Sequence, residues 1–199
     1  MILDISDKGV FDGVEVTAAE DYDYLPAPEV HPRDEQNIVG VITGTFDVLH
    51  QGHIYLIRQA KKRCDKLVIG IETDNRVRAA KGKRRPIFHA AQRKKRLERA
   101  LADGTVVEVL LETFGDEQIR RAWLRDHHAK LLFTTKYDQH LKNKQLAMLN
   151  VGGRVEFLNN YASISTTQIL EGRRPPRYLV YDSDIPIVER FRQKNHGQS

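Results

Sequence analysis

The amino-acid sequence predicts an α/β fold, a Rossmann-like parallel sheet of about five strands sandwiched by helices. Three observations predict it. Five short apolar runs are nearly continuous, as in strands that are buried on both faces. The segments between these runs place apolar residues at helical spacing. The alternation of strand and helix then requires parallel strands joined by right-handed crossovers.

The elements follow one another regularly from residue 38 onward. The predicted strands lie at residues 38–43, 67–71, 106–111, 131–135 and 155–158. Two predicted helices are defined by apolar side chains that share a face: Ile54, Ile57, Ala60 and Cys64 in the first, and Ile119, Ala122 and Trp123 in the second. We expect one domain over residues 37–172. An N-terminal arm with a Pro-rich linker precedes it (residues 1–36), and an irregular C-terminal tail follows it (residues 173–199).

Composition excludes several classes of protein. The chain has 199 residues, of which 40% are apolar, enough for a core. No run approaches the roughly 18 uninterrupted apolar residues of a membrane helix, and no secretory signal is visible at the start, so we expect a cytoplasmic protein without membrane contact. The single cysteine, Cys64, excludes an intrachain disulfide and a Cys-rich zinc site.

Charge is distributed unevenly along the chain. Residues 1–36 hold ten acidic and two basic side chains, whereas residues 81–99 hold nine basic and one acidic side chain. Such blocks are typical of interaction surfaces or of solvated faces. We expect the acidic arm to dock on the basic segment, within one chain or in a homodimer. In the arm, the alternation at residues 2–5, the turn signal at residues 7–9, and the run at residues 14–16 after Asp12-Gly13 favour a short hairpin.

The turn after the first strand has the pattern of a phosphate site. Gly44 follows the strand and a helix starts near residue 51, an arrangement that directs backbone N–H groups and the helix dipole at an anion. Gly52 has no Cβ to obstruct a nucleotide. His50 and His53 are three residues apart and share a face of the helix. Two imidazole donors there would stabilise charge that develops on a phosphate, although cap and surface roles are the alternative.

Residues 44–53 resemble the signature of the cytidylyltransferase-like nucleotidyltransferases. The resemblance extends over residues 38–171 and implies transfer of a nucleoside monophosphate from ATP or CTP, with Mg²⁺, to a phosphorylated small molecule. It implies that His50 and His53 stabilise the transferring group and that Gly44, Thr45, Phe46 and Gly52 line the phosphate turn. Asp47 belongs to the same motif, or is simply the N-cap of the helix.

A second signature of this family is similar to residues 164–169. Ser165 followed by Gln168 forms a capping box, and Gly172 is suited to the end of that helix. The resemblance implies that Ser165, Thr166 and Thr167 hold the far phosphates of the nucleotide.

The basic segment is similar to the lysine loop of this family and to the arginine helix that follows. The resemblance implies that Lys81 or Lys83 and Arg93 bind phosphate, with Asp74 near them. Arg93 lies one turn before Leu97, so we expect it beside the buried face of its helix. The other helical cations are expected to be solvated: Lys95, Arg96 and Arg99.

The branch of the family stays open. Residues 152–159 resemble sugar-phosphate adenylyltransferases, residues 137–139 including Asp138 resemble flavin-adenylating enzymes, and residues 164–165 resemble glycerol-phosphate cytidylyltransferases. Asn160-Tyr161 replaces the Arg-Thr pair of cytidylyltransferases, which favours ATP over CTP. Thr135-Lys136 replaces an expected loop glycine.

Two other classes of function compete with the enzyme. Residues 81–99 could neutralise the phosphates of a nucleic acid, but Phe88 is their only aromatic residue, which disfavours base stacking. The second competing class is a catalytically silent regulatory domain that binds nucleotide. We expect a nucleoside triphosphate and a phosphorylated small molecule as partners, and no nucleic acid.

Overall fold

The computed structural model describes residues 9–11, 14–16, 37–159 and 164–196. They fall into two compact units, Met1–Pro32 and Arg33–Ser199. In the first unit, β1 (Gly9–Phe11) pairs antiparallel with β2 (Val14–Val16). The predicted hairpin strand at residues 14–16 is confirmed, and its partner is Gly9–Phe11. The expected strand at residues 2–5 lies outside the described residues.

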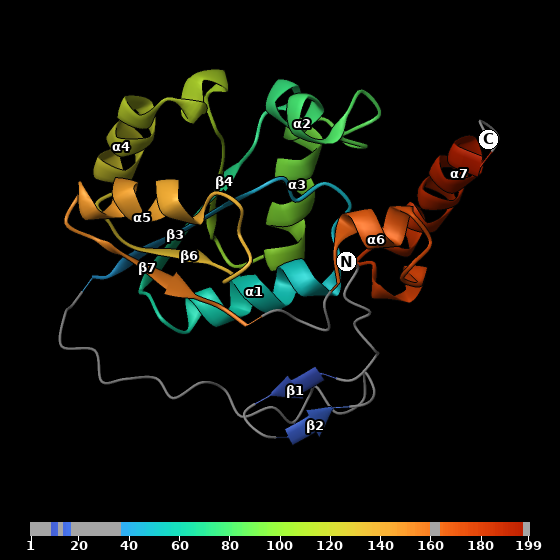
Figure 1. Cartoon of the computed structure of the whole chain (residues 1–199), viewed down its shortest axis with the longest axis horizontal. Coiled ribbons are helices and arrows are strands. Elements are labelled where there is room, and N and C mark those ends of the chain that lie inside the picture. The colour runs from blue at the N-terminus through green and yellow to red at the C-terminus, as the bar shows by residue number, and fades with distance from the viewer. Residues whose placement is uncertain (1–8, 12–13, 17–36, 160–163, 197–199) are drawn as a thin grey trace, which may run out of the picture. The chain divides into compact units, whose positions relative to one another are not determined.

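The second unit is built on a parallel sheet of five strands in the order β5-β4-β3-β6-β7 (Figure 1). The strands are β3 (Val39–Gly44), β4 (Lys66–Ile71), β5 (Val106–Val109), β6 (Ala129–Thr134) and β7 (Arg154–Phe157). All five lie where the apolar runs predict them, and the α/β class is confirmed. β3 is central, so its carboxyl end lies where the order of strands reverses, which is the usual ligand site of an open α/β sheet.

Helices cover both faces of the sheet. They are α1 (Gln51–Lys61), α2 (Asp74–Lys81), α3 (Ala90–Leu101), α4 (Glu117–Asp126), α5 (Leu141–Leu149), α6 (Thr166–Leu170) and α7 (Ile185–His196). On one face, residues such as Ile57 of α1 and Leu97 of α3 pack on Ile69 of β4. On the other face, Leu124 of α4 and Met148 of α5 pack on Val41 of β3.

A third apolar cluster holds the C-terminal segment against the loop after β3. It joins Val48 to Ile169 of α6 and Val188 of α7. Residues 173–184 form two short 3-10 turns, Pro176–Tyr178 and Asp182–Asp184. Ile185–His196 forms a helix that the sequence analysis did not predict. Among the described residues, no helix has the length and apolar character needed to span a bilayer.

Candidate active site

Two histidines lie where the loop after β3 enters α1. His50 is the N-cap residue of α1, and its backbone N–H donates to Nδ1 of His53 at 3.4 Å. The two imidazole rings stack with centroids 3.7 Å apart and planes 24° from parallel. The expectation that both histidines share a face of the helix start is confirmed.

The histidine pair carries hydrogen-bonding groups without partners. His50 is 3% exposed, and within the described part of the chain neither of its ring nitrogens has a hydrogen-bond partner. Burial lowers the pKa of His50 to about 4. Burial also lowers the pKa of His53 well below its usual range, with smaller contributions from His50 and Lys81. Both rings are therefore neutral at pH 7, and a buried N–H donor without a partner indicates a ligand site.

Gly52 packs closely against the His50 ring. A Cβ at this position would lie 3.0 Å from Nδ1 of His50 and 3.4 Å from the carbonyl oxygen of Ile164. The contact with His50 is tighter than most side chains make, so a larger residue at position 52 would require the His50 ring to shift by a few tenths of an ångström. This close approach is a packing reason for Gly52, besides the expected space for a nucleotide.

The lowered pKa of His50 predicts that stability decreases in mild acid. The unfolded chain takes up a proton near pH 6.5, whereas the folded chain resists protonation of His50 until about pH 4. In that window the unfolded state binds more protons, so the free energy of unfolding should fall by up to about 1.4 kcal/mol per pH unit for this residue. Urea unfolding between pH 7 and pH 5 measures the slope. The His50→Gln variant should show a shallower dependence of the unfolding free energy on pH. An unchanged slope in this variant would contradict the lowered pKa of His50.

Lys81, at the end of α2, reaches back to the glycine turn. Its Nζ donates to Oγ1 of Thr45 at 3.2 Å. Loss of hydration, followed by the proximity of Arg85, lowers the pKa of Lys81. Lys83 is exposed and, within the part of the chain that the structure describes, makes no such contact with the turn. Of the two lysines, Lys81 is therefore the one that contacts the glycine turn.

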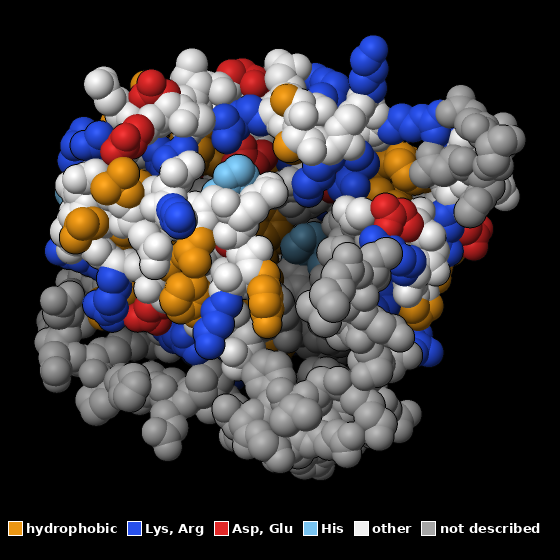
Figure 2. All heavy atoms as spheres, viewed as in Figure 1, with side chains coloured by type: hydrophobic (Ala, Val, Ile, Leu, Met, Phe, Trp, Pro, Cys, Tyr) orange, Lys and Arg blue, Asp and Glu red, His pale blue; other side chains and the backbone are white. Residues whose placement is uncertain are grey.

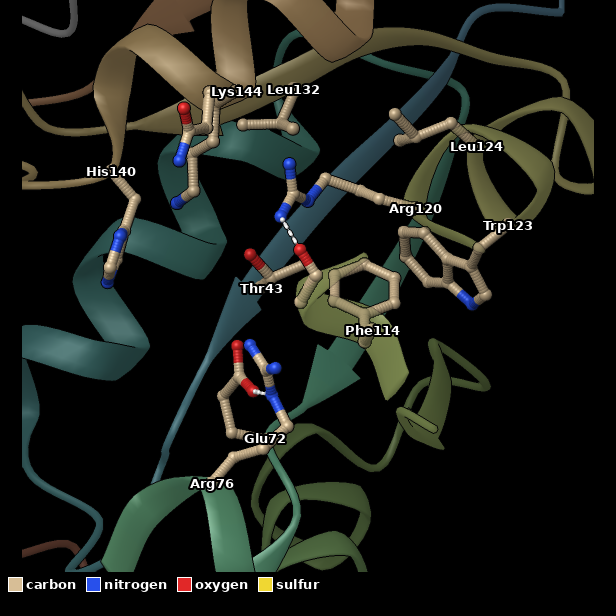
Figure 3. Close-up of a pocket in the computed structure, with 12 residues that line it drawn as sticks. Thr43, Glu72, Arg76, Phe114, Arg120, Trp123, Leu124, Leu132, His140 and Lys144 are labelled. Atoms are coloured by element: carbon tan, nitrogen blue, oxygen red, sulfur yellow. Dashed lines mark hydrogen bonds and ion pairs between the residues drawn. The ribbon is translucent and has the colours of Figure 1, made fainter. Parts of the chain in front are cut away.

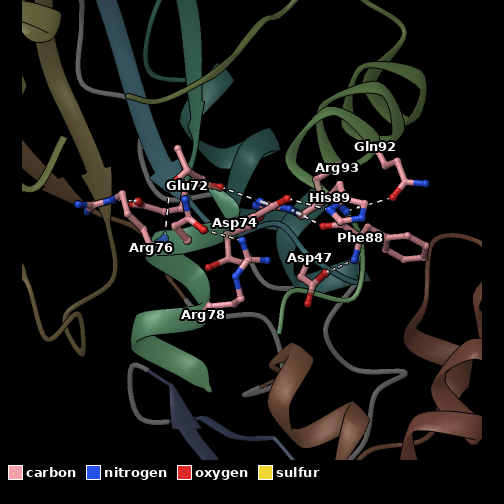
Figure 4. Close-up of polar contacts among 12 residues, drawn as sticks. Asp47, Glu72, Asp74, Arg76, Arg78, Phe88, His89, Gln92 and Arg93 are labelled. Atoms are coloured by element: carbon pink, nitrogen blue, oxygen red, sulfur yellow. Dashed lines mark hydrogen bonds and ion pairs between the residues drawn. The ribbon is translucent and has the colours of Figure 1, made fainter. Parts of the chain in front are cut away.

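Arg93 of α3 is not directed into an open cleft, which corrects the expectation that it binds phosphate. The residue is 1% exposed. Its guanidinium donates to the carbonyl oxygens of Phe88 at 2.9 Å, Thr45 at 2.6 Å and Glu72 at 2.7 Å, and to Oδ1 of Asp74 at 2.7 Å (Figure 4). These four hydrogen bonds join three loops that come from separate parts of the sequence. Arg93 therefore holds the loops at Thr45, Glu72 and Phe88 together and does not face an open ligand site.

The two aspartates predicted to bind nucleotide are engaged by the protein. Asp47 is 1% exposed and accepts hydrogen bonds from Nε of Arg85 at 2.8 Å and from the backbone N–H of Ile87 and Phe88. The alternative that Asp47 caps α1 is wrong, because His50 holds that position. At the start of α2, burial alone would raise the pKa of Asp74. Its hydrogen bonds with Arg93 and His89 outweigh burial, so the pKa is lowered. Both carboxylates anchor the basic segment.

A pocket of about 180 Å³ lies beside the histidines at the carboxyl ends of β3 and β6. Predicted site residues that line it are Gly44, Thr45, Phe46, His53 and Asp138. Figure 2 shows a histidine side chain recessed in a hollow, with lysine and arginine side chains near its rim.

Asp138 stands on the wall of this pocket and holds a cation there. Burial alone would raise the pKa of Asp138. The Lys144 ammonium, 2.6 Å away, and the hydrogen bond from Thr134 outweigh that effect and lower the pKa. The carboxylate is therefore ionised at neutral pH and fixes Lys144 at the edge of the pocket.

The second signature forms the capped helix α6. The side chain of Ser165 accepts from the backbone N–H of Gln168 at 3.2 Å, so the predicted capping box is confirmed. Gly172 follows the helix with a φ of 79°, in agreement with the predicted stop. Thr166 is buried and its hydroxyl donates to the carbonyl oxygen of Val48 at 3.4 Å. Thr167 is exposed, so Ser165 and Thr167 are the members of this signature that a ligand can reach.

Sequence reasoning missed the contribution of the C-terminal segment to the site. Leu179 forms a β-bridge with His50, and the backbone N–H of Val180 donates to the carbonyl oxygen of Leu49 at 3.0 Å. The residues that precede His53 are thus held by backbone pairing from the far end of the chain. The apolar Leu179-Val-Tyr run was the only sequence signal for this contact.

Arg96 connects the same segment to α3, contrary to the expected solvated face. Its guanidinium stacks between Phe88 and Tyr181, at 4.3 and 4.5 Å from the ring centroids, and bonds the buried carboxylate of Asp184. Several cations of the basic segment are therefore committed to the fold.

Comparison with known proteins places these features in a family. Residues 41–172 match the family model described as cytidylyltransferase-like. The chain is 30% identical over 141 residues to the bifunctional protein HldE of Rhodospirillum rubrum, and 32% identical over 139 residues to that of a Caulobacter species. These matches cover 66% and 69% of this chain, but only 26% and 27% of the relatives. The chain thus spans about a quarter of their length.

Solved structures share the fold. A bifunctional NMN adenylyltransferase/ADP ribose pyrophosphatase from Francisella tularensis superposes with a TM-score of 0.58 at 20% identity, over 78% of this chain and 50% of that one. The lipopolysaccharide core biosynthesis protein from Thermoplasma volcanium has a TM-score of 0.50 at 24% identity, over 62% of this chain and 98% of that one. At such identities the likeness shows a common architecture.

Proposed function

The chain belongs to the cytidylyltransferase-like family, and on this premise we propose that it is a nucleotidyltransferase that uses ATP to adenylylate a small phosphomonoester. A phosphate oxygen of the acceptor attacks the α-phosphorus of ATP. The bond from that phosphorus to the bridging oxygen breaks, and pyrophosphate leaves. Such a reaction needs chiefly positioning of the reactants and neutralisation of charge.

The observation that carries this proposal is the histidine pair. His50 and His53 are stacked, neutral and next to the pocket behind Gly44, and the ring nitrogens of His50 lack partners in the described part of the chain. Neutral imidazole N–H groups fixed in advance can stabilise negative charge as it develops on the α-phosphate and on the leaving oxygen. The start of α1 adds its dipole at the same place.

Other cations and hydroxyls support the triphosphate in this proposal. Lys81 lies at Thr45 and would neutralise the β- and γ-phosphates. Ser165 and Thr167, at the exposed start of α6, would bind their far end. Among the described residues, no three His, Cys, Asp or Glu side chains converge on a metal position. In this proposal Mg²⁺ arrives with the triphosphate and is held mainly by phosphate oxygens and water.

We infer that ATP is preferred over CTP and that the acceptor is a sugar phosphate. The Arg-Thr pair of cytidylyltransferases is replaced by Asn160-Tyr161, which lie outside the described residues. Residues 152–159 resemble sugar-phosphate adenylyltransferases, and the relatives at 30% and 32% identity are bifunctional HldE proteins. Glycerol phosphate and FMN are the competing acceptors.

The nucleic-acid alternative is disfavoured by how the basic segment is used. Arg85, Arg93 and Arg96 each pair with a buried or half-buried carboxylate inside the fold. Charge that is neutralised internally adds little to a field that attracts phosphates from solution. The positive charge that residues 81–99 expose to solvent is therefore smaller than their count of basic residues suggests.

A pyrophosphate-release screen tests the proposal. The full chain is incubated with Mg²⁺, each of the four ribonucleoside triphosphates, and glucose 1-phosphate, glycerol 3-phosphate or FMN. We expect release with ATP and the sugar phosphate, and none after EDTA is added. Binding of ATP without release for any acceptor would support the regulatory alternative. RNA binding that weakens steeply with salt, without ATP binding, would support the nucleic-acid alternative.

A further inference from the structure

A second pocket, of about 230 Å³, lies on the other side of the carboxyl end of β3 (Figure 3). It is bounded by α4, the start of α5 and the short 3-10 turn Glu112–Gly115. It shares Thr43 and Lys144 with the pocket beside the histidines. The two pockets therefore adjoin without coinciding, as the two substrates of a group transfer require.

Cations gather at the end of this second pocket nearest Thr43. Arg120 projects from α4 toward Thr43, and its Nη2 donates to the carbonyl oxygen of Gly115 at 3.0 Å. This is its only hydrogen bond to any residue that the structure describes. Arg76 donates from Nε to Oε2 of Glu72 at 2.5 Å, and its terminal nitrogens are likewise uncommitted among those residues. Two guanidinium groups with free N–H donors, beside Lys144, can bind a phosphate by several charge-assisted hydrogen bonds.

Gly115 allows this arrangement. A Cβ at residue 115 would lie 2.7 Å from Nη1 of Arg76. The glycine thus brings the loop against Arg76 while its carbonyl holds Arg120. The two arginines, from helices on separate crossovers, converge through this one residue.

Two aromatic side chains also line the second pocket. The rings of Phe114 and Trp123 meet edge to face, with centroids 5.5 Å apart. The indole N–H is directed away to Oε2 of Glu108 at 3.1 Å, so the indole contributes carbon surface to the pocket. Glu72 also lines the pocket and lies beside Arg76, which engages one of its carboxylate oxygens (Figure 3). The aromatic rings can pack against the C–H groups of a sugar ring, and the Glu72 carboxylate can accept a hydrogen bond from one of its hydroxyl groups.

We propose that this second pocket binds the acceptor as a small sugar phosphate. The phosphate lies between Arg76, Arg120 and Lys144, facing the histidine pocket across Thr43. The apolar face of the sugar ring packs on Phe114 and Trp123, and a hydroxyl donates to Glu72. The assignment of a sugar rests on the proposed function, since only a transferase needs a second substrate at this position.

The size of the second pocket favours a monosaccharide. Its volume of about 230 Å³ is below the range of roughly 300–1,000 Å³ typical of sites for larger ligands. The tricyclic ring and ribityl phosphate of FMN exceed what it can enclose. Glycerol phosphate would fill the cationic end and leave the aromatic wall uncovered. Arg120 is accordingly a specificity residue for the acceptor phosphate, and Trp123 for the ring.

Trp123 is the only tryptophan of the chain, so its fluorescence reports occupancy of the second pocket without any reaction. The full chain is titrated with glucose 1-phosphate, mannose 1-phosphate and ribose 5-phosphate, and with glycerol 3-phosphate, free glucose and inorganic phosphate as comparisons. We expect a saturable change in emission with at least one sugar phosphate. Free glucose should produce none, and glycerol 3-phosphate and inorganic phosphate a smaller one.

Two variants test whether the change in Trp123 emission comes from binding in the second pocket. Arg120→Gln keeps an amide donor for Gly115 but removes the charge, and it should weaken sugar-phosphate binding at least tenfold while ATP binding, measured by calorimetry, stays unchanged. Arg125→Ala, an exposed cation on the same helix, should bind as the parent does. Emission that responds to no sugar phosphate, or an equal response in Arg120→Gln, would overturn the acceptor pocket even if pyrophosphate is released. Absence of both ATP binding and pyrophosphate release would instead overturn the proposed function.

Discussion

Replacing His50 or His53 by alanine is expected to lower kcat by ~10²–10³, equivalent to roughly 2.7–4 kcal/mol of transition-state stabilisation. The reason is geometric. The two rings are stacked 3.7 Å apart at the start of α1, and the neutral His50 ring has no hydrogen-bond partner among the described residues. Its N–H is therefore available for charge that appears only as the α-phosphate reacts. Because this charge is absent in the ground state, KM for ATP should change much less than kcat.

The histidine prediction has a matched control at the opposite end of the sheet. His128 is exposed in the turn that precedes β6, where its φ is 53°. His128→Asn removes an imidazole while retaining a residue that tolerates this backbone conformation, and it should leave turnover unchanged. Circular dichroism confirms folding of each variant before pyrophosphate release is measured. Turnover at the parental rate in a folded His50→Ala or His53→Ala protein would exclude a role for that ring in the reaction.

The fold and the histidine pair could be predicted because local patterns determine them. Continuous apolar runs are what buried parallel strands require, and all five lie in the sheet. The spacing of His50 and His53 places them on one face of any helix that begins there. The capping box at Ser165 and Gln168 is likewise a contact within four residues. Each of these features depends on neighbours in the sequence.

The roles of the charged residues could not be predicted in the same way, because they depend on contacts between distant segments. Arg93 was placed correctly on the buried side of its helix. Its partners lie 5 to 48 residues away, and three of them are backbone carbonyl oxygens that have no side-chain signature. Arg96 resembles any surface cation in sequence, yet it meets Asp184, 88 residues further on. The second pocket forms where α4 and α5 meet the end of β3, and no motif marks it.

Substitution of Arg93 is expected to damage the fold more than any other change in the basic segment. Its guanidinium is buried and makes four hydrogen bonds that join the loops at Thr45, Glu72 and Phe88. Removing one partner of a buried ion pair typically costs roughly 3–5 kcal/mol; here Asp74 would lose its guanidinium partner and keep its contact with His89. We therefore expect Arg93→Ala to lower the free energy of unfolding by about this amount in urea. Arg93→Lys should recover little, since an ammonium lacks the planar fork that reaches three loops at once.

The comparison between Arg93→Lys and Lys95→Ala separates an organising residue from a ligand. Lys95 is exposed on the same helix, and its removal should change stability by no more than about 0.5 kcal/mol. If Arg93 organises the site, Arg93→Lys loses stability in the absence of any nucleotide, and the loss persists at high salt because the contacts are buried. If Arg93 instead bound phosphate, the variant would unfold like the parent and lose only affinity for ATP. The buried hydrogen bonds to Thr45, Glu72 and Phe88 predict the first result, and equal unfolding midpoints for the parent and Arg93→Lys would refute it.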